Sequence, residues 1–272
     1  MESIIKKQKK GDKNMALLTV NLQSNTLRTG TSITVILPQK KFWSTEDVPP
    51  HQTLYFFSGG FTDHTYTQRN TAIERLATEY NVAVVMPYMA GRYLYKNMPH
   101  GEQWWTYYSE ELPAICENMF RLSRNREDTF VAGGSGGGYA ALKLALEKPE
   151  RFGAVAGMCP MLFSQRALEG LKESSTMAWR YEELSYIYGK QLSPEYDVFE
   201  ILKASSEKEQ QAAMYLCCGT EDKLFDLNAA FRDKAVELGF NPTWDQRPGG
   251  HTMEYSDEML PEVLNWFTLK KL

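Results

Sequence analysis

A serine inside a glycine-rich run is the residue of this chain whose surroundings most favour covalent chemistry. The pattern Gly133-x-Ser135-x-Gly137 follows an apolar run at residues 129–132 and precedes a helix-like run at residues 139–146. A serine held on a tight turn between a strand and a helix projects its hydroxyl away from the backbone. Glycine is needed beside it because a Cβ there would clash with the neighbouring strand and helix. The pattern therefore predicts a nucleophile elbow with Ser135 as the nucleophile.

Two other kinds of glycine-rich site compete with this interpretation. A phosphate-binding Walker loop ends in Lys followed by Ser or Thr, whereas this run continues with Gly138 and Tyr139. A dinucleotide-binding fingerprint needs an acidic residue after the next strand. The next expected strand, residues 152–158, is followed instead by Cys159 and Pro160. Both alternatives fit the run less well than a nucleophile elbow does.

The base that activates the serine is expected among the histidines, because a hydroxyl is a weak nucleophile until a base accepts its proton. The four histidines are His51, His64, His100 and His251. In hydrolases with this elbow the nucleophile, the acid and the histidine follow one another in that chain order. Only His251 comes after Ser135, and it lies in a loop, residues 248–252, before the last expected helix. We expect His251 to be the base; the alternative is an ordinary surface-loop histidine.

The acid that orients the histidine is expected directly after the strand at residues 213–218. Glu221 and Asp222 follow that strand, and Asp226 comes one helical turn later. Asp222 has the position the geometry needs, and its carboxylate would accept the ring N–H of His251 and stabilise the imidazolium. Glu221 and Asp226 are the fallbacks. A helix N-cap is the structural alternative for Asp222.

Backbone N–H groups are expected to bind the oxyanion of an acyl-transfer reaction. One donor should be Gly136, immediately after the nucleophile, and the other should come from the loop after the third strand, residues 58–61. We expect the second donor to be Gly60, with Phe61 as the alternative. A plain Gly-Gly turn would explain the same residues without a functional role.

Strands and helices that could position these residues alternate along the chain after a first hairpin around Thr29-Gly30. The expected strands are residues 17–23, 32–37, 54–57, 82–86, 129–132, 154–158, 213–218 and 243–247, and the expected helices are residues 70–80, 110–122, 139–146, 228–238 and 254–269. This alternation predicts an α/β fold with a mostly parallel sheet that carries helices on both faces.

Residues 160–206 interrupt the alternation with a long segment that is rich in aromatic residues. Its large apolar side chains are Met161, Leu162, Phe163, Trp179, Tyr181, Tyr186 and Tyr188. A helical excursion that packs these side chains into the core is one interpretation. We favour a helical cap inserted over the active site, which would supply substrate pockets.

Length and composition limit the remaining function classes. The chain has 272 residues, which suits one α/β domain. Its formal net charge of −4 gives no reason to expect nucleic-acid binding. Residues 1–14 carry a basic run that predicts a disordered tail rather than a secretory signal, and residues 15–272 are expected to form the domain. No apolar run approaches the length of a membrane span. The scattered cysteines indicate a reducing, cytoplasmic setting and show no metal-ligand spacing.

These residues together resemble a known family, the tributyrin esterases of Gram-positive bacteria, in the esterase D and S-formylglutathione hydrolase branch of the α/β-hydrolases. The resemblance extends from about residue 16 to the C-terminus. It rests on the glycine-rich run at 133–139, the Ser-Gly-Gly loop at 58–60, residues 218–222 and 250–251, and three further segments, 50–55, 84–87 and 110–113.

The resemblance implies an α/β-hydrolase fold and a cytoplasmic serine carboxylesterase that acts on short-chain acyl esters without a cofactor or metal. It assigns the nucleophile to Ser135, the acid to Asp222, the base to His251 and the oxyanion N–H groups to Gly60 and Gly136. Self-association is common in this fold, and the sequence leaves the oligomeric state open.

The chain departs from the family at two positions, and three alternatives to a carboxylesterase stay open. The family has His where Ser58 stands and Met where Gly136 stands, but backbone donors survive both changes. One alternative is a thioesterase or S-formylglutathione hydrolase with the same triad. A second is a carbohydrate esterase that removes acetyl or feruloyl groups, in which Trp104 or Trp105 could stack on sugar rings, although core packing explains such residues equally well. A third is a degenerate hydrolase that acts as a binding protein.

Overall fold

Eight strands form a single sheet in the computed structural model, which describes residues 14–39, 49–89 and 96–269. The strand order is β1-β2-β4-β3-β5-β6-β7-β8. β1 pairs antiparallel with β2 and β2 with β4, whereas every pair from β4 to β8 is parallel. The strands are β1 (Asn14–Ser24), β2 (Thr29–Gln39), β3 (Thr53–Phe57), β4 (Ala83–Pro87), β5 (Thr129–Gly134), β6 (Ala154–Met158), β7 (Ala213–Gly219) and β8 (Thr243–Arg247).

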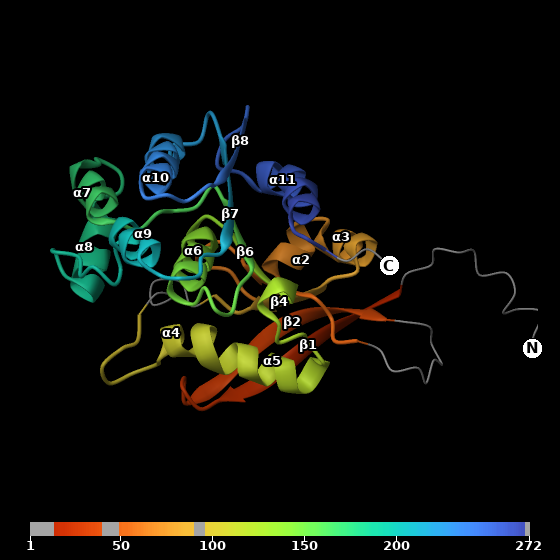
Figure 1. Cartoon of the computed structure of the whole chain (residues 1–272). Coiled ribbons are helices and arrows are strands. Elements are labelled where there is room, and N and C mark those ends of the chain that lie inside the picture. The colour runs from red at the N-terminus through yellow and green to blue at the C-terminus, as the bar shows by residue number, and fades with distance from the viewer. Residues whose placement is uncertain (1–13, 40–48, 90–95, 270–272) are drawn as a thin grey trace, which may run out of the picture.

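Helices cover both faces of the sheet, which confirms the predicted fold class. α6, α9 and α10 lie on one side and α3 and α11 on the other (Figure 1). The α-helices are α2 (Tyr66–Asn70), α3 (Ile73–Tyr80), α4 (Trp104–Thr106), α5 (Leu112–Phe120), α6 (Gly136–Glu147), α7 (Gln165–Glu173), α8 (Ala178–Tyr188), α9 (Val198–Ser206), α10 (Phe225–Glu237) and α11 (Met253–Trp266).

The central strands are buried on both faces, as a parallel sheet covered by two helical layers requires. All five residues of β3, β4 and β6 are buried. Successive residues of β5 point to opposite faces. Val131 therefore packs in the core on the α6 side, while Phe130 and Ala132 pack in the core under α3 and α11.

The segment that leads into α5 differs from the single helix predicted over residues 110–122. Helical structure begins at α4, continues through a π-helical turn at Tyr107–Glu111, and becomes α-helical at α5. The N–H of Leu112 bonds to the carbonyl of Tyr107 and closes the wider turn. Pro113 lies in the first turn of α5, where a proline is tolerated because its missing N–H would have no partner within the helix.

The π-helical turn places Glu111 against the β1–β2 hairpin. Its carboxylate accepts hydrogen bonds from the Ser24 hydroxyl at 2.6 Å, the Asn25 N–H at 2.7 Å and the Thr26 N–H at 3.2 Å. The Thr26 hydroxyl donates to the same carboxylate. Burial acts to raise the pKa of Glu111, but these hydrogen bonds outweigh it and hold the pKa below its usual value.

The predicted helix over residues 70–80 is confirmed as α3, although α3 begins later, at Ile73, and a short helix that was not predicted, α2, precedes it. The chain breaks between them at Thr71 and Ala72, where the Ala72 N–H donates to the Asp257 carboxylate of α11 at 2.6 Å. A partner 185 residues away in the sequence therefore satisfies the backbone group at this break.

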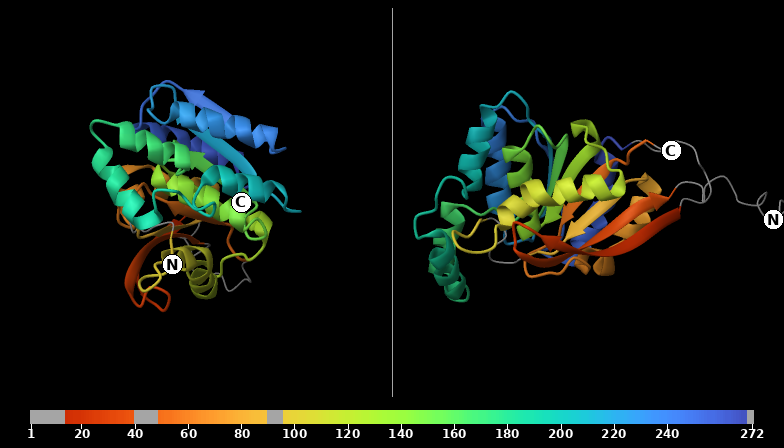
Figure 2. Two further views of the ribbon diagram at one scale, coloured as in Figure 1. Left: turned by 90° about the vertical axis from the view of Figure 1, so that its left-hand side faces the viewer. Right: turned by 90° about the horizontal axis from the view of Figure 1, so that it is seen from below.

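The segment predicted as a cap, residues 160–206, forms α7, α8 and α9. Figure 2 shows α7 and α8 together at one end of the molecule. The Leu162, Phe163 and Tyr188 side chains are buried, whereas Trp179 and Tyr186 are 60% and 93% exposed. The aromatic residues of this segment are thus divided between the core and the surface.

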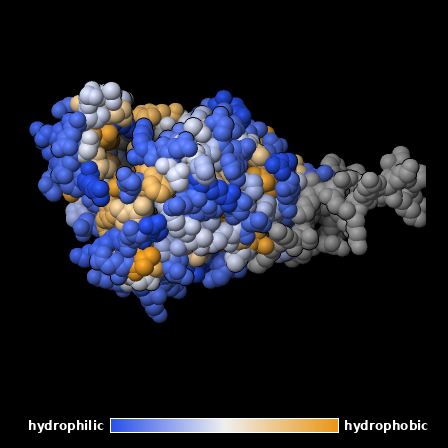
Figure 3. Space-filling model, turned by 90° about the horizontal axis from the view of Figure 1, so that it is seen from above, coloured by the Kyte–Doolittle hydropathy of each residue, from blue (hydrophilic) through white to orange (hydrophobic). Residues whose placement is uncertain are grey.

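Polar residues cover most of the face drawn in Figure 3, and apolar residues form small separate groups on it. Among the described residues, no helix combines the length and apolar character that a membrane span requires. The predicted tail, residues 1–14, falls outside the described residues except for Asn14, which begins β1.

Candidate active site

Ser135 occupies the turn between β5 and α6 in a backbone conformation that most residues avoid. Its φ is 52° and its ψ is −122°. Such a conformation costs on the order of 1–3 kcal/mol and persists where surrounding contacts fix it. The Ser135 N–H donates to the Met158 carbonyl at 3.0 Å, and the Ser135 carbonyl accepts from the Met161 N–H at 2.8 Å. These hydrogen bonds hold the turn against the end of β6 and the residues that follow it.

The glycines around Ser135 are required by close backbone packing. A Cβ on Gly137 would contact the carbonyl oxygens of Phe57 and Ser58, and a Cβ on Gly133 would contact the backbone of Gly137. The first turn of α6 therefore lies directly against the end of β3. This packing is the physical reason for the glycine spacing seen in the sequence.

Ser135, His251 and Asp222 form a continuous hydrogen-bonded chain. His251 Nε2 lies 2.9 Å from Ser135 Oγ, and His251 Nδ1 lies 2.7 Å from Asp222 Oδ2. The Asp222 side chain is fully buried, whereas that of His251 is 31% exposed. The structure thus brings together the three residues predicted as nucleophile, base and acid.

Each member of the Asp222–His251 pair shifts the pKa of the other. The hydrogen bond to Asp222 is the main cause that raises the pKa of His251 to about 9, the contact with Cys159 adds to it, and burial opposes it. Burial acts to raise the pKa of Asp222, but hydrogen bonds from His251 and the Leu224 N–H outweigh it and hold the pKa below its usual value. A buried, ionised carboxylate beside an imidazole favours the protonated imidazole.

Backbone hydrogen bonds join the loop that carries Asp222 to the loop that carries His251. The Glu221 N–H donates to the Gly249 carbonyl, and the Thr220 N–H donates to the Arg247 carbonyl, both at 2.9 Å. Gly249 has a φ of 145°, which favours glycine. These contacts set the spacing of Asp222 and His251 independently of their side chains.

The fallback acids differ from Asp222 in burial, and His64 has a partner outside the Ser135–His251–Asp222 chain. Glu221 and Asp226 are exposed, whereas Asp222 is buried beside His251. Asp222 is not the N-cap of α10, which is Leu224, but its second oxygen accepts the Leu224 N–H at 2.9 Å. One carboxylate therefore both stabilises its own loop and orients the histidine. His64 Nδ1 lies 2.8 Å from the Thr34 hydroxyl.

The loop after β3 lies beside Ser135, as predicted. A Cβ on Gly59 would lie 3.7 Å from the Ser135 Cβ, and Gly60 lines the cavity next to the nucleophile. Phe61 follows at a φ of 64° with 65% of its surface exposed. Gly136, the other predicted donor, is the first residue of α6. The two predicted oxyanion donors thus lie on the segments that flank the nucleophile.

A cavity of about 220 Å³ opens beside Ser135 and His251. Its walls combine apolar side chains with hydroxyl groups. The apolar side chains include Phe56, Met158 and Leu260, and the hydroxyl groups include those of Ser58, Thr67, Thr71 and Ser256. Its described lining comes from α2, α11, the strand ends and the loops that follow them, and includes no residue of the predicted cap, residues 160–206. The Arg180 guanidinium of α8 lies 4.7 Å from the ring centre of Phe61, which follows Gly60.

The tryptophans considered for sugar stacking pack away from this cavity. The Trp104 ring lies 5.7 Å from that of Tyr108, and the Trp105 indole donates to Glu147 at 3.0 Å. Neither is among the residues that line the cavity. Core packing accounts for both positions.

Cys159 is the residue next to the site that the sequence did not single out. It follows β6, lines the cavity and contacts His251 and Asp222. A hydrogen bond with Cys218, together with burial, raises the pKa of its thiol. The signal that could have found it is its position, because residues directly after the strand next to the nucleophile strand come close to the elbow.

The sequence and structure are similar to those of known esterases. The profile of the family described as "Putative esterase" matches residues 24–257. An acetyl esterase of Caldicellulosiruptor saccharolyticus is 23% identical over 93% of this chain and 98% of its own length. The crystal structure of an S-formylglutathione hydrolase from Staphylococcus aureus aligns with a TM-score of 0.83 at 29% identity, over 93% of this chain and 99% of the other.

A ferulic acid esterase structure has the same fold, with a TM-score of 0.76 at 21% identity over 94% of this chain and 98% of the other. Both the sequence profile and the fold therefore agree over most of the chain. The protein belongs to this esterase family and is a carboxylic ester hydrolase with the α/β-hydrolase fold.

Proposed function

We propose that the protein hydrolyses short-chain acyl esters through a Ser135–His251–Asp222 triad and an acyl-enzyme intermediate. The observation that carries the proposal is the hydrogen-bonded chain from Ser135 Oγ through both ring nitrogens of His251 to the buried Asp222 carboxylate. This arrangement gives the hydroxyl a base and gives the base an orienting acid.

The proposed reaction proceeds in two acyl transfers. His251 Nε2 takes the proton of Ser135 as Oγ attacks the ester carbonyl, and Asp222 stabilises the resulting imidazolium. The N–H groups of Gly60 and Gly136 hold the oxyanion of the tetrahedral intermediate. His251 then protonates the leaving alcohol, and water repeats the sequence on the acyl-enzyme to release the acid.

A preference for short acyl groups is supported by the size of the cavity. Its volume of about 220 Å³ is below the roughly 300–1,000 Å³ of pockets that enclose drug-sized ligands. The hydroxyl groups on its walls reduce the apolar surface available to a long chain. The resemblance to tributyrin esterases points to short-chain acyl esters as well. We also propose that α7–α9 form the cap-like insertion predicted over residues 160–206.

The nucleophile is tested with p-nitrophenyl esters from acetate to octanoate, wild type beside Ser135→Ala. We expect hydrolysis that is fastest for short chains and a loss of at least about 10⁴-fold in kcat for the variant. Labelling with a fluorophosphonate, followed by mass spectrometry of the peptide that carries Ser135, tests the nucleophile independently of substrate choice. Ser206→Ala, which alters a serine of α9 outside the cavity lining, is the matched control. Turnover or labelling that survives Ser135→Ala would exclude the triad.

The acyl pocket is tested with Gly134→Ala. A Cβ at Gly134 would lie 3.8 Å from the Met158 carbonyl oxygen and 4.0 Å from Ser256 Oγ, so a methyl group fits without a clash and occupies the cavity. We expect kcat/KM to fall more for butyrate and hexanoate esters than for acetate. An equal fall in kcat/KM for all chain lengths would mean that the acyl group does not occupy the part of the cavity beside Gly134.

Thioester hydrolysis is the second candidate, because the Staphylococcus aureus neighbour at 29% identity is an S-formylglutathione hydrolase. The same triad serves both reactions. The two are separated by comparing kcat/KM for S-formylglutathione with that for p-nitrophenyl acetate. A value higher by more than about 100-fold for the thioester would make it the preferred substrate class.

A further inference from the structure

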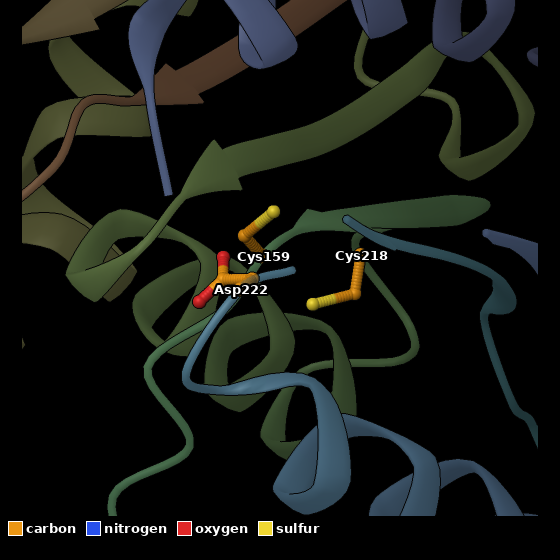
Figure 4. A group of neighbouring side chains, drawn as sticks. All are labelled: Cys159, Cys218 and Asp222. Atoms are coloured by element: carbon orange, nitrogen blue, oxygen red, sulfur yellow. The ribbon is translucent and has the colours of Figure 1, made fainter. Parts of the chain in front are cut away.

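Two cysteines from adjacent strands lie beside the acid of the proposed triad. Cys159 follows β6, Cys218 lies in β7, and Asp222 lies in the loop after β7. β6 and β7 pair in parallel up to Met158 and Cys217, which brings the residues after them together. The two sulfur atoms and a carboxylate oxygen lie within 4.8 Å of one another. Figure 4 shows the three side chains grouped, with the Cys218 sulfur directed toward the other two.

This set of atoms suits a soft divalent cation. Thiolates select Zn²⁺ and its heavier relative Cd²⁺ over Mg²⁺ and Ca²⁺, and a carboxylate commonly completes such a site. In a tetrahedral site with Zn–S bonds of about 2.3 Å, two sulfur atoms lie about 3.8 Å apart. Since the ligating atoms already lie within 4.8 Å of one another, the separation of the two sulfur atoms needs to shrink by about 1 Å at most to hold the ion.

The group is accessible from the active site although it is buried. Cys159 lines the cavity beside Ser135. Cys218 and the Asp222 side chain lie behind it, with no exposed surface. A dehydrated cation can thus reach the first sulfur through the opening that admits the ester.

We propose that Cys159, Cys218 and Asp222 bind Zn²⁺ or Cd²⁺ and that this binding reversibly stops ester hydrolysis. Asp222 Oδ2 is the acceptor of His251 Nδ1 at 2.7 Å, so a cation that takes the carboxylate competes with the imidazole for it. Each thiol releases its proton to solvent as its sulfur binds the ion, and no electron is transferred. The loss of turnover rests on the proposed triad; the binding itself does not.

The other two cysteines lie outside the proposed site, and one of them, Cys116, provides a control. Cys116 is buried in α5, and Cys217 is buried in β7. Neither belongs to the group of ligating atoms. Cys116→Ser therefore removes one buried thiol from the protein without removing a ligand of the proposed site.

The test is a titration of the full-length, reduced protein with CdCl₂, followed by the ultraviolet charge-transfer absorption of Cd–thiolate bonds and by p-nitrophenyl acetate hydrolysis in parallel. We expect one Cd²⁺ per chain, inhibition that follows the absorption change, and recovery with EDTA. Cys218→Ala should lose the absorption and raise the inhibitory Cd²⁺ concentration by at least about tenfold relative to its own metal-free rate. Cys116→Ser should titrate like the wild type.

Inhibition of Cys218→Ala at the wild-type Cd²⁺ concentration would overturn the proposal, as would wild-type absorption in that variant. If Cys218→Ala does not fold, Cys159→Ala tests the same prediction through the absorption change. A protein that binds Cd²⁺ with this absorption but has no metal-free esterase activity would refute the proposed function and keep the site. An active esterase without the absorption would refute the site alone.

Discussion

Glu111 and Asp222 are two carboxylates with lowered pKa values in different regions of the molecule, and they differ in their hydrogen-bond partners. Glu111 accepts four hydrogen bonds from Ser24, Asn25 and Thr26 of the β1–β2 hairpin. Asp222 accepts one backbone N–H and shares its other oxygen with His251. Donors that do not titrate near neutral pH surround Glu111, whereas Asp222 faces the imidazole of His251, which contacts the Ser135 hydroxyl.

The comparison shows that a lowered pKa does not by itself identify a functional carboxylate. Hydrogen bonds from any donor stabilise the ionised form. What distinguishes Asp222 is its partner, His251, whose imidazole can gain or lose a proton and which lines the cavity. Substitutions at the two carboxylates should therefore separate stability from activity.

Asp222→Asn is expected to have the largest effect. An amide at this position can hold the loop but cannot orient and stabilise a protonated His251, so kcat should fall by roughly 10³- to 10⁴-fold. The thermal midpoint should change much less than that loss suggests, because Asn can still accept the Leu224 N–H. Steady-state kinetics and calorimetry on the same preparation test both parts. A variant with wild-type kcat would mean that Asp222 is structural, like Glu111.

Glu111→Gln should show the opposite pattern. Gln retains one acceptor oxygen but loses the charge that strengthens the hydrogen bonds to the hairpin. Because Glu111 is partly exposed, the free energy of unfolding should fall by only about 1–2 kcal/mol. The kcat should stay within about twofold, because Glu111 is not among the residues that line the cavity. Urea unfolding and esterase assays measure the two quantities. A loss of kcat with unchanged stability would contradict this assignment.

Acid should reduce the difference between wild type and Glu111→Gln. The pKa of Glu111 is lower in the folded state than in the unfolded state, so its contribution to stability is fully present above the unfolded pKa of about 4.3. The contribution is lost as the pH falls through the folded pKa. Urea midpoints at pH 6 and at successively lower pH should therefore converge for the two proteins. A constant gap would show that the charge of Glu111 contributes nothing.

Much of the fold and of the candidate site could be predicted because its determinants are local in sequence. The glycine spacing around Ser135 reflects packing within one strand–turn–helix unit, and the chain order then led to His251 and Asp222. The buried strands are marked by short apolar runs, and β6 and β8 have the predicted bounds. The structure brings the three side chains into contact, while their catalytic roles stay predictions.

Features that depend on distant contacts could not be predicted. The break between α2 and α3 is stabilised by Asp257, and the role of Glu111 depends on a hairpin about 85 residues earlier in the chain. Cys159 and Cys218 are separated in sequence and meet only because β6 and β7 are neighbours. None of these pairings leaves a pattern of period or spacing in a single sequence.

The π-helical turn at Tyr107–Glu111 makes this part of the chain sensitive to a change in length. A π-turn holds one more residue than an α-turn, and each residue rotates an α-helix by about 100°. Deleting one residue from the turn would regularise the helix and rotate α4 relative to α5 by that angle. If α5 kept its position, Trp104 and Trp105 would lose their contacts with Tyr108 and Glu147. If α4 kept its position, Glu111 would lose its hydrogen bonds to the β1–β2 hairpin. Among related sequences, insertions and deletions should therefore be rarer here than substitutions.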